Sequence, residues 1–516
     1  MRHGSLGRGP SDLVGGHWLE LSSGGGEIAS FSPANPSVRV WGGVSSLAHL
    51  DRAVEAAREA GKVWSRWPLE RRIAVLRRYQ QVCAAKQDAI AAMIRDETGK
   101  VSWDAKAEAG LLGSKVDITL DTGPEGAMRR VTGIETKLAE TRLGRSWFRP
   151  HGVMAVLGPF NFPMHLPNGH IVPALAMGNT VVFKPSDKTP GCGQLLAELL
   201  QEALDAEGAP PGVVNLVQGR AEAAQRLVRH EGVDGVLFTG SWPVGRAILE
   251  ANLDSPGRIC ALEMGGNNAA LIMPDADLKQ AVIECVRSAF ITSGQRCTCT
   301  RRLVVHRDVA ERVIAAVCKA ASNLVIGDPA ASHPVFMGPV ISEQARRAIL
   351  EAQARFVGDG AAALMPCSAM DGPGWYVTPG VLRVSRFVAH DRGDGADVEV
   401  FGPLLRVCVV GSLDEGIEQV NATRYGLAAS IFTKDGASVE RFLHEARAGC
   451  VNVNTGTAGA SSKLPFGGLG LSGNHRPAGS FSLDYCAYPV AGMIEGGSAA
   501  QVPAGMRFEE SWVAGA

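Results

Sequence analysis

The chain has 516 residues, and its 51 Lys and Arg residues nearly cancel its 52 Asp and Glu residues, which leaves a net charge of −1. Hydrophobic residues make up 46% of the sequence and charged residues 20%, a composition that excludes a disordered chain. The balanced charge gives no reason to expect nucleic acid or an anionic membrane as a partner. The sequence has no apolar run of 18 residues, so we expect no membrane span.

The cysteines and the first residues favour a cytoplasmic location. Eleven cysteines are scattered along the chain, and an odd number at wide spacing indicates reduced thiols rather than a disulfide framework. Residues 1–10 lack the apolar run of a signal peptide. The sequence contains no CxxC pair and no HExxH motif, so we expect no metal site.

The first 44 residues are rich in Gly, Ser and Pro, and we expect short strands and turns there. Helical periodicity begins at Ser45, and either Ser45 or Ser46 can cap that helix. A second apolar stripe predicts one helix over residues 69–94, and Gly99 is a typical helix stop.

From His151 onward, short apolar runs alternate with helical stretches. This alternation predicts crossover units and a parallel sheet, whose ligands bind at the carboxyl ends of the strands. A similar series from about residue 260 to residue 454 predicts a second α/β domain. The strands expected in the two series are at residues 153–157, 180–183, 213–217, 236–239, 269–272 and 302–306, and the helices at 170–176, 193–204, 221–230, 278–291 and 309–323.

Two segments fit neither series. Residues 132–148 are polar and alternating, and residues 483–493 are strand-like. We expect them to pair as an arm, which lies between the domains or reaches toward another subunit.

Cys297 differs from the other cysteines in its context. The helical stretch 278–291 ends before it, and the Ser293-Gly294 turn places it on a loop. A lone cysteine is most often a small buried apolar residue, whereas a thiol on a loop is available as a nucleophile. We expect the adjacent Arg296 to favour its thiolate.

Two polar residues lie in apolar surroundings. Glu263, between Leu262 and Met264, has the context of a desolvated carboxyl with a raised pKa, as a general base near neutrality requires. The alternative is an exposed turn carboxylate. Asn161 lies among Phe and Pro residues, and its amide can donate to a developing oxyanion. The alternative is a turn residue.

Together these residues resemble one family, the NAD(P)-dependent aldehyde dehydrogenases. The resemblance extends from near Trp18 to about Met493, and Glu263 and Cys297 have the family's usual separation of 34 residues (297 minus 263). The motifs that carry it lie at residues 158–163, 184–186, 238–245, 262–268, 294–298, 399–403 and 465–468.

The resemblance implies an α/β fold with a Rossmann-type cofactor domain, a second α/β domain that carries the nucleophile, and a small oligomerisation arm of β-strands. It also implies a homodimer or a homotetramer. The corresponding ranges are 1–130 and 150–261 for the NAD-binding domain, 262–458 for the catalytic domain, 131–149 and 480–497 for the arm, and 498–516 for a C-terminal tail.

The family implies a role for each of the three polar residues. Cys297 would attack the aldehyde, and Asn161 with the Cys297 backbone N–H would hold the oxyanion. The thiohemiacetal would give up a hydride to the nicotinamide and leave a thioester, and Glu263 would activate the water that hydrolyses it.

The cofactor residues follow from the same resemblance. Asp187 would accept from a ribose 2′-OH and repel a 2′-phosphate, which favours NAD. Lys184 and Lys188 would offset part of this repulsion, which leaves use of NADP open. The expected cofactor contacts are Lys184, Ser186, Asp187, Gly240, Ser241, Gly245, Glu399 and Phe401.

Within the family, the chain resembles the members that oxidise N-succinyl-L-glutamate 5-semialdehyde to N-succinyl-L-glutamate in bacterial arginine catabolism, and the stretches that carry this resemblance are residues 158–170, 262–268, 295–299, and 473–477 with 484–489. Such a substrate carries carboxylates, which need cationic or donor groups near the site. The expected contacts are Arg296, Thr298, His475 and Arg476.

Two alternatives stay open. Residues 452–458 depart from the pattern of that subgroup, so the substrate can be another semialdehyde. A CoA-acylating aldehyde dehydrogenase shares the fold and the thiol, but it does not need Glu263 to activate water.

Overall fold

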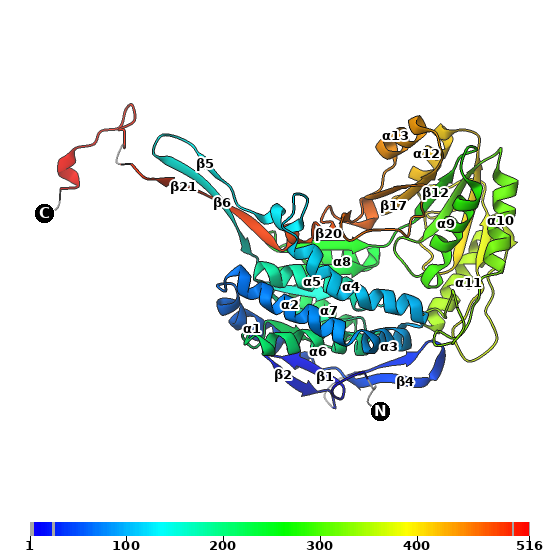
Figure 1. Ribbon diagram of the computed structural model, residues 1–516, viewed down its shortest axis with the longest axis horizontal. Helices are drawn as coiled ribbons and strands as arrows, with labels where there is room; N and C mark the ends of the chain where they lie inside the picture. Colours follow the sequence, from blue (N-terminus) through cyan, green and yellow to red (C-terminus); the bar gives the residue numbers. More distant parts are fainter. Residues whose placement is uncertain (1–4, 23–25, 498–499, 515–516) are drawn as a thin grey trace.

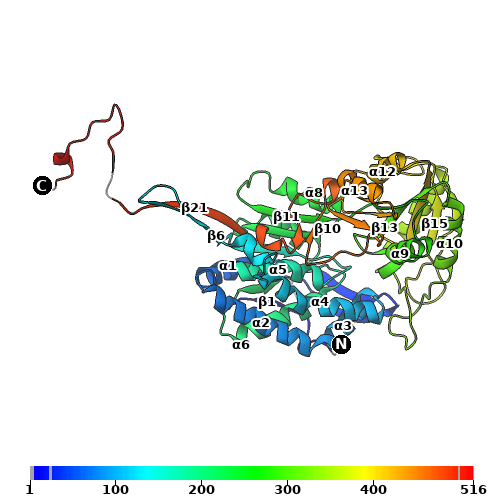
Figure 2. The same cartoon turned by 45° about the horizontal axis from the view of Figure 1, so that its top comes forward.

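The computed structural model describes residues 5–22, 26–497 and 500–514. Two seven-stranded sheets, each covered by helices, form the body of the protein (Figures 1 and 2). The expected α/β fold with two largely parallel sheets is confirmed. No helix among the described residues is long and apolar enough to cross a membrane.

The first sheet has the strand order β11-β10-β7-β8-β9-β1-β2. Its five strands from β7 to β11 are parallel, and β1 and β2 extend it as antiparallel strands at one edge. The chain runs outward from β7 through β8 and β9 and then returns to place β10 on the other side of β7. This reversal is a topological switch point, where open α/β sheets bind their ligands. The strands are β1 (Ser11–Val14), β2 (His17–Glu20), β7 (Val153–Leu157), β8 (Thr180–Lys184), β9 (Val214–Leu216), β10 (Gly235–Gly240) and β11 (Ile259–Met264).

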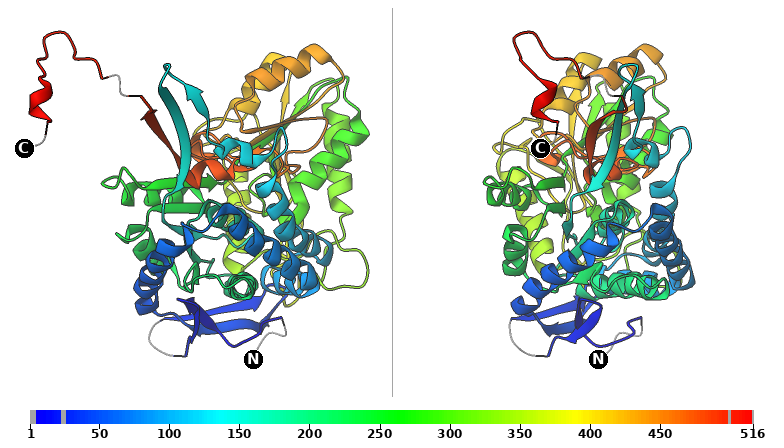
Figure 3. Two further views of the ribbon diagram at one scale, coloured as in Figure 1. Left: turned by 60° about the vertical axis from the view of Figure 1, so that its left-hand side comes forward. Right: turned by 90° about the vertical axis from the view of Figure 1, so that its left-hand side faces the viewer.

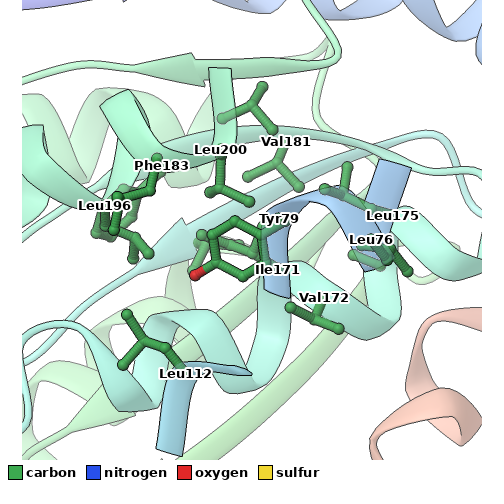
Figure 4. Close-up of a cluster of buried hydrophobic side chains, with 14 of the residues drawn as sticks. Leu76, Tyr79, Leu112, Ile171, Val172, Leu175, Val181, Phe183, Leu196 and Leu200 are labelled. Carbon is green, nitrogen blue, oxygen red and sulfur yellow. The ribbon is translucent and has the colours of Figure 1, made fainter. Parts of the chain in front are cut away.

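Helices cover both faces of this sheet, so its central strands are buried throughout. Met154 and Val156 face one core, and their neighbours Val153 and Ala155 face another. Figure 4 shows part of the larger core, where Tyr79 lies among aliphatic side chains. The helices are α1 (Leu47–Trp64), α2 (Leu69–Ala85), α3 (Gln87–Thr98), α4 (Ser102–Leu120), α5 (His165–Met177), α6 (Pro190–Ala206), α7 (Ala221–Arg229) and α8 (Trp242–Ala251).

The helix ends correct several expectations. The single helix expected over residues 69–94 is wrong, because the backbone of Lys86 leaves the helical region (φ −113°, ψ 17°) and separates α2 from α3. The break allows the apolar faces of both helices to pack in one core. Gly99 ends α3 with φ 74°, as predicted. Ser46 does precede α1, but its side chain makes no capping hydrogen bond. Helix α5 begins five residues earlier than expected, at His165.

The second sheet has the order β14-β15-β16-β13-β12-β17-β18, and all of its pairs except β14 with β15 are parallel. Strand β11 pairs with β10 in the first sheet, so the expected domain boundary at residue 262 falls inside a strand. The strands are β12 (Asn268–Ile272), β13 (Thr300–His306), β14 (Ala362–Met365), β15 (Gly380–Arg383), β16 (Leu404–Val410), β17 (Ala428–Phe432) and β18 (Cys450–Val453), and the helices are α9 (Leu278–Phe290), α10 (Ala310–Ser322), α11 (Glu343–Gly358), α12 (Leu413–Asn421) and α13 (Gly436–Glu445).

A third, three-stranded sheet projects from the body (Figures 1 and 3). Its order is β21-β6-β5, and β21 pairs with β6 from Ala487 opposite Pro150 to Glu495 opposite Arg142. The two segments that fitted neither series therefore do pair. The strands are β5 (Glu135–Lys137), β6 (Arg142–Pro150) and β21 (Ala487–Glu495). Of the expected tail, residues 498, 499, 515 and 516 lie outside the described residues.

Short elements complete the chain. They are the hairpin of β3 (Glu27–Ser32) and β4 (Asn35–Val44), the pair of β19 (Pro465–Phe466) and β20 (Ala478–Gly479), and the 3₁₀ turns η1 (Ala127–Val131), η2 (Ile291–Gly294), η3 (Gly470–Ser472), η4 (Ser482–Tyr485) and η5 (Glu510–Trp512).

Candidate active site

The three predicted catalytic side chains lie where the two sheets meet. Asn161 follows β7, Glu263 lies in β11, and Cys297 precedes β13. The Asn161 side-chain amide donates to the Gln295 carbonyl at 3.0 Å, and the Glu263 carboxyl lies near enough to the Cys297 thiol for each group to shift the pKa of the other. The fold therefore brings together three residues that are far apart in the sequence.

A left-handed turn precedes the nucleophile. Thr292 and Ser293 both have φ 54°, and Gly294 follows with φ 71°. Residues other than glycine rarely adopt this left-handed backbone conformation, because it costs about 1–3 kcal/mol for each residue. Partners hold the turn: the Thr292 hydroxyl donates to Asp104 at 2.6 Å and the Ser293 hydroxyl to the Gly338 carbonyl at 2.7 Å. The loop that carries Cys297 is thus strained and fixed.

Arg301 holds the same loop from the side of β13, a role that the sequence analysis missed. Its buried guanidinium donates to the carbonyls of Gly266 (3.2 Å), Gly294 (3.1 Å) and Arg296 (2.9 Å). The available signal was the charged pair Arg301-Arg302 within a buried strand. A buried arginine needs several acceptors, so such a pair indicates a structural cluster.

Glu263 is desolvated, as its sequence context predicted. Its side chain is buried, and neither carboxylate oxygen has a hydrogen-bond partner among the described residues. Burial raises the pKa of Glu263 to about 8, while its interaction with the Cys297 thiol opposes the rise. The carboxyl can therefore exchange a proton near neutral pH.

The environment of Cys297 differs from our expectation. Burial raises the pKa of its thiol well above the usual range, and the negative charges of Glu263 and Glu399 add to the rise. The expectation that Arg296 favours the thiolate is wrong, because its guanidinium donates to Asp104 (2.7 Å) and to the Thr292 hydroxyl (2.8 Å). The nucleophile is a neutral thiol at pH 7, so it needs a base before it can attack.

Asn161 is buried, and its amide is oriented by Gln295. An amide nitrogen carries two N–H donors. One of them is used in the bond to the Gln295 carbonyl, and the second can donate to a ligand. The arrangement suits an oxyanion hole, which needs donors that are already in place.

The residues expected to bind the adenosine ribose lie at the end of β8. Lys184 is buried, donates to the Pro185 carbonyl at 2.7 Å, and has its pKa lowered to about 8 by burial. The Ser186 hydroxyl accepts from the Lys188 N–H at 3.2 Å. Asp187 is exposed. A buried cation and an exposed carboxylate thus lie three residues apart at the carboxyl end of a parallel strand, where ligands bind.

The residues expected at the pyrophosphate lie beside the switch point. Helix α8 begins after Ser241, whose side chain makes no capping hydrogen bond, and Pro243 lies in its first turn as predicted. Gly245 packs so tightly against Met264 that a larger residue would collide with it, and Gly240 is equally close to the Phe238 ring. The uncapped start of α8 fits a phosphate group.

Glu399 and Phe401 precede β16, beside the loops that carry Cys297 and Asn161. Glu399 accepts from the Gly266 N–H at 3.1 Å and from Arg301 at 3.5 Å, and its position leaves no room for a side chain at Gly265. The Phe401 ring contacts Phe160 edge-on with centroids 5.8 Å apart. Both residues therefore adjoin Cys297 and Asn161, where a nicotinamide is expected.

The predicted substrate contacts fall into two groups. Arg296 is engaged by Asp104, and the buried Thr298 accepts from the Thr457 hydroxyl through its carbonyl (2.7 Å). His475, with φ 60°, and Arg476 are both exposed.

Contacts of Gly473 and Asn474 that the sequence analysis missed bring the exposed pair near Glu263. Gly473 forms a β-bridge with Glu263. The Asn474 side chain accepts from the Leu262 N–H at 3.0 Å and donates to the Cys260 carbonyl at 2.8 Å. Asn474 therefore anchors the His475-Arg476 turn to the strand that carries Glu263.

The comparisons with known proteins agree with this geometry. A sequence model of the aldehyde dehydrogenase family matches residues 18–489 of this chain. The chain belongs to the aldehyde dehydrogenase family. This confirms the family resemblance found in the sequence, and an aldehyde dehydrogenase is an NAD(P)-dependent oxidoreductase.

Curated relatives match nearly the whole chain. An aldehyde dehydrogenase of Caulobacter vibrioides, named N-succinylglutamate 5-semialdehyde dehydrogenase 1, is 43% identical over 464 residues, which cover 90% of this chain and 95% of that protein. The N-succinylglutamate 5-semialdehyde dehydrogenase of Caulobacter sp. strain K31 is 44% identical over 480 residues, with 93% and 95% covered.

Solved structures of aldehyde dehydrogenases have the same fold. Lactaldehyde dehydrogenase from Escherichia coli gives a TM-score of 0.87 at 28% identity, with 94% of this chain and 99% of that chain covered. A Thermus 1-pyrroline-5-carboxylate dehydrogenase with bound NAD also gives 0.87 at 28% identity, with 95% and 93% covered.

Proposed function

We propose that this aldehyde dehydrogenase oxidises N-succinyl-L-glutamate 5-semialdehyde to N-succinyl-L-glutamate, with NAD as its cofactor. The name shared by the curated relatives at 43% and 44% identity supports the substrate, and a role in arginine catabolism goes with it. The observation that carries the chemistry is the buried Glu263 carboxyl. It has no hydrogen-bond partner among the described residues, and it lies near enough to the Cys297 thiol for each group to shift the pKa of the other.

The first half of the reaction is the attack of Cys297 on the aldehyde carbon. The half-buried thiol is neutral, so its proton has to leave as the bond forms, and the nearby Glu263 carboxylate can accept it. The negative charge that develops on the aldehyde oxygen is stabilised by the second N–H of Asn161 and the backbone N–H of Cys297. NAD(P), when bound, takes up the hydride that this carbon loses.

The second half is hydrolysis of the thioester on Cys297. Glu263 first releases to solvent the proton that it took from the thiol. Its carboxylate then accepts a proton from the attacking water, because a carboxylate with a pKa of about 8 is a stronger base than an ordinary one, and it returns that proton to the departing thiolate. The water oxygen attacks the thioester carbon, and the carboxylic acid leaves as the thiol is regenerated. The position of Glu263 favours hydrolysis over acyl transfer to CoA.

The basic side chains near the site support a substrate aldehyde that carries carboxylates. His475 and Arg476 are exposed on the turn that Asn474 ties to β11, so their donors can reach a substrate carboxylate at the mouth of the site. Arg296 can add a positive charge nearer to Cys297, since its side chain stays 17% exposed beside Asp104. Thr298 lies too deep for such a contact and is proposed to line the pocket.

The residues proposed to bind the cofactor come from both sheets, with those for the ribose and the pyrophosphate on the first sheet and those for the nicotinamide before β16 of the second. We assign the ribose to Lys184, Ser186 and Asp187 after β8, and the pyrophosphate to Gly240, Ser241 and Gly245 at α8. Glu399 and Phe401 are assigned to the nicotinamide end. The exposed carboxylate of Asp187 favours NAD, since it would repel a 2′-phosphate.

The projecting sheet is proposed to be the oligomerisation arm of a homodimer or a homotetramer. Met493 (74% exposed) and Ile494 (50%) of β21 and Ile134 (66%) beside β5 leave an apolar surface on it. In addition, β21 is an edge strand whose outer side is unpaired in the described sheet. Exposed apolar edges of this kind are usually covered by a partner.

We expect Glu263→Gln to separate the two halves of the reaction. The steady-state rate falls at least about 100-fold, while a pre-steady-state burst of NADH persists with external base. The wild-type rate rises as the pH passes through about 8, because the base must be ionised, and the variant loses this rise. Cys297→Ala abolishes the burst, and Cys318→Ala, at a half-buried thiol on α10, is the control. An unchanged steady-state rate in Glu263→Gln contradicts the base role.

The substrate is tested with purified enzyme and four aldehydes. We expect kcat/KM to be highest for N-succinylglutamate semialdehyde, ahead of glutamate semialdehyde, succinate semialdehyde and a simple aliphatic aldehyde. Arg476→Met raises KM about tenfold for the succinylated substrate only, because one charge-assisted contact is lost. Arg441→Met, at another exposed arginine, serves as the control. A preference for a different semialdehyde keeps the mechanism and points to residues 452–458 as the divergent pocket wall.

The cofactor preference depends on Asp187. We expect Asp187→Ser to raise the ratio of kcat/KM with NADP to that with NAD by at least about tenfold, because a like charge next to the 2′-phosphate is removed. Asp254→Ser, at an exposed aspartate beyond α8, leaves the ratio unchanged. Equal ratios in both variants would place the ribose elsewhere.

The arm predicts an oligomer in solution. Sedimentation equilibrium should give at least twice the chain mass of 54.2 kDa. We expect Met493→Glu to shift the distribution toward the monomer, since it buries a charge in the interface. Leu253→Glu, at a position that is 75% exposed outside the arm, leaves it unchanged. A monomeric wild-type protein would refute the proposed role.

A further inference from the structure

A buried cluster of charges lies directly behind the catalytic loop. Helix α4 carries Asp104 and Glu108 one turn apart, on the same face, and both are almost fully buried. Each binds one cation: Asp104 accepts from Arg296 at 2.7 Å, and Glu108 forms an ion pair with the buried Lys100. Buried charges of this kind are costly unless they are paired, so the four side chains are fixed by one another.

One aromatic ring joins the two ion pairs. Lys100 Nζ lies 3.3 Å from the centroid of the Phe162 ring, and the Arg296 guanidinium lies 5.0 Å from it. We call Lys100, Phe162 and Arg296 the Phe162 stack. Phe162 directly follows Asn161, and Arg296 directly precedes Cys297. The stack therefore links the loop of the oxyanion donor to the loop of the nucleophile.

The two carboxylates of α4 fix one loop each. Glu108 accepts from the backbone N–H groups of Met164 and His165, both at 3.1 Å, where the Asn161 loop enters α5. Asp104 uses its two oxygens separately, one for the Thr292 hydroxyl and the other for Arg296. These two partners lie at the two ends of the left-handed turn before Cys297.

We propose that Asp104 is a positioning residue that sets the distance between Cys297 and Asn161. It is not a catalytic residue, since it acts only through Thr292 and Arg296. Its carboxylate closes the strained turn at both ends, and α4 holds the Asn161 loop through Glu108 one turn further on. The proposal rests on the proposed roles of Cys297 and Asn161, and it is independent of which aldehyde is the substrate.

The chemistry of the contact explains why a carboxylate is needed. An aspartate can accept two charge-assisted or hydroxyl hydrogen bonds, one on each oxygen. An asparagine in the place of Asp104 would offer one oxygen and one NH₂ group. Either the Arg296 guanidinium or the Thr292 hydroxyl would then face an NH₂ donor instead of an acceptor. Without the closure, the left-handed Thr292 and Ser293 can relax toward ordinary backbone conformations, and the thiol moves relative to the oxyanion donor.

The test compares Asp104→Asn with Asp117→Asn. Both are the same substitution on helix α4, but Asp117 is exposed and pairs with Arg77 and Gln80, away from the loop. We expect Asp104→Asn to lower kcat about 100-fold, as a misplacement of about 1 Å does. NAD affinity, measured by calorimetry, and KM for an uncharged aliphatic aldehyde stay within about threefold of the wild type, since none of the residues proposed to bind these two ligands contacts Asp104.

Two aldehydes separate positioning from substrate contact. If Asp104 acts by placing Cys297, kcat falls equally for N-succinylglutamate semialdehyde and for an uncharged aliphatic aldehyde. A change in KM for the succinylated aldehyde with kcat unchanged for both aldehydes would show that Asp104 acts only through Arg296 as a substrate group, and it would overturn the proposal. A kcat within about threefold of that of Asp117→Asn would overturn it as well.

A second variant covers the case in which Asp104→Asn does not fold. Thr292→Val keeps the β-branched shape and the Asp104–Arg296 ion pair, but it removes the hydroxyl. We expect it to lower kcat about tenfold for both aldehydes, while the folded variant keeps the NAD affinity of the wild type. An unchanged kcat in Thr292→Val would show that the hydrogen bond between Thr292 and Asp104 does not position Cys297, and it would overturn the proposal. The proposed function fails on a different result, namely activity retained in Cys297→Ala.

Discussion

The buried guanidinium of Arg301 is the interaction on which the site depends. It donates to carbonyls of Gly266, Gly294 and Arg296, and it also reaches the Glu399 carboxylate at 3.5 Å. These partners belong to the crossing between the sheets, the left-handed turn, the nucleophile loop and the proposed nicotinamide site. A planar cation with five donors can bind all of them from one fixed position, which a lysine cannot do. Each of these segments is irregular, so none of them has a ladder of its own to hold it.

Burial has the same effect on both reacting groups. It raises the pKa of Glu263 to about 8 and that of Cys297 well above its usual range, because water is withdrawn from each. Both groups are therefore largely neutral at pH 7, and the negative charge of either one opposes that of the other. Charge forms in this site when Glu263 first loses its proton to solvent, and the carboxylate that results can then accept the proton of the Cys297 thiol. The neutral state restrains the thiol from reacting with oxidants before the aldehyde and the cofactor have arrived.

The sequence predicted the sheets well and the loop contacts poorly, for a physical reason. Short, continuous apolar runs such as β7 and β8 are buried on both faces of the sheet. Such runs are typical of central parallel strands, so they can be recognised in the sequence. The break at Lys86 and the partner of Arg296 depend instead on tertiary packing, which has no periodic signal. Glu263 was found because its apolar flanks predict burial directly. Arg301 and Asn474 were missed, because their roles consist of contacts to residues that are distant in the sequence.

Glu263 and Cys297 are supplied by different sheets. Strand β11, which carries Glu263, is the edge of the first sheet, and Cys297 lies on the loop that enters β13 in the second. The chain crosses between the sheets only three residues after β11 ends at Met264. Neither half can hold a complete set of reacting groups by itself. Turnover therefore reports on the docking of the two halves as well as on their folding, and a hinge opening that left every helix and strand intact would still silence the enzyme.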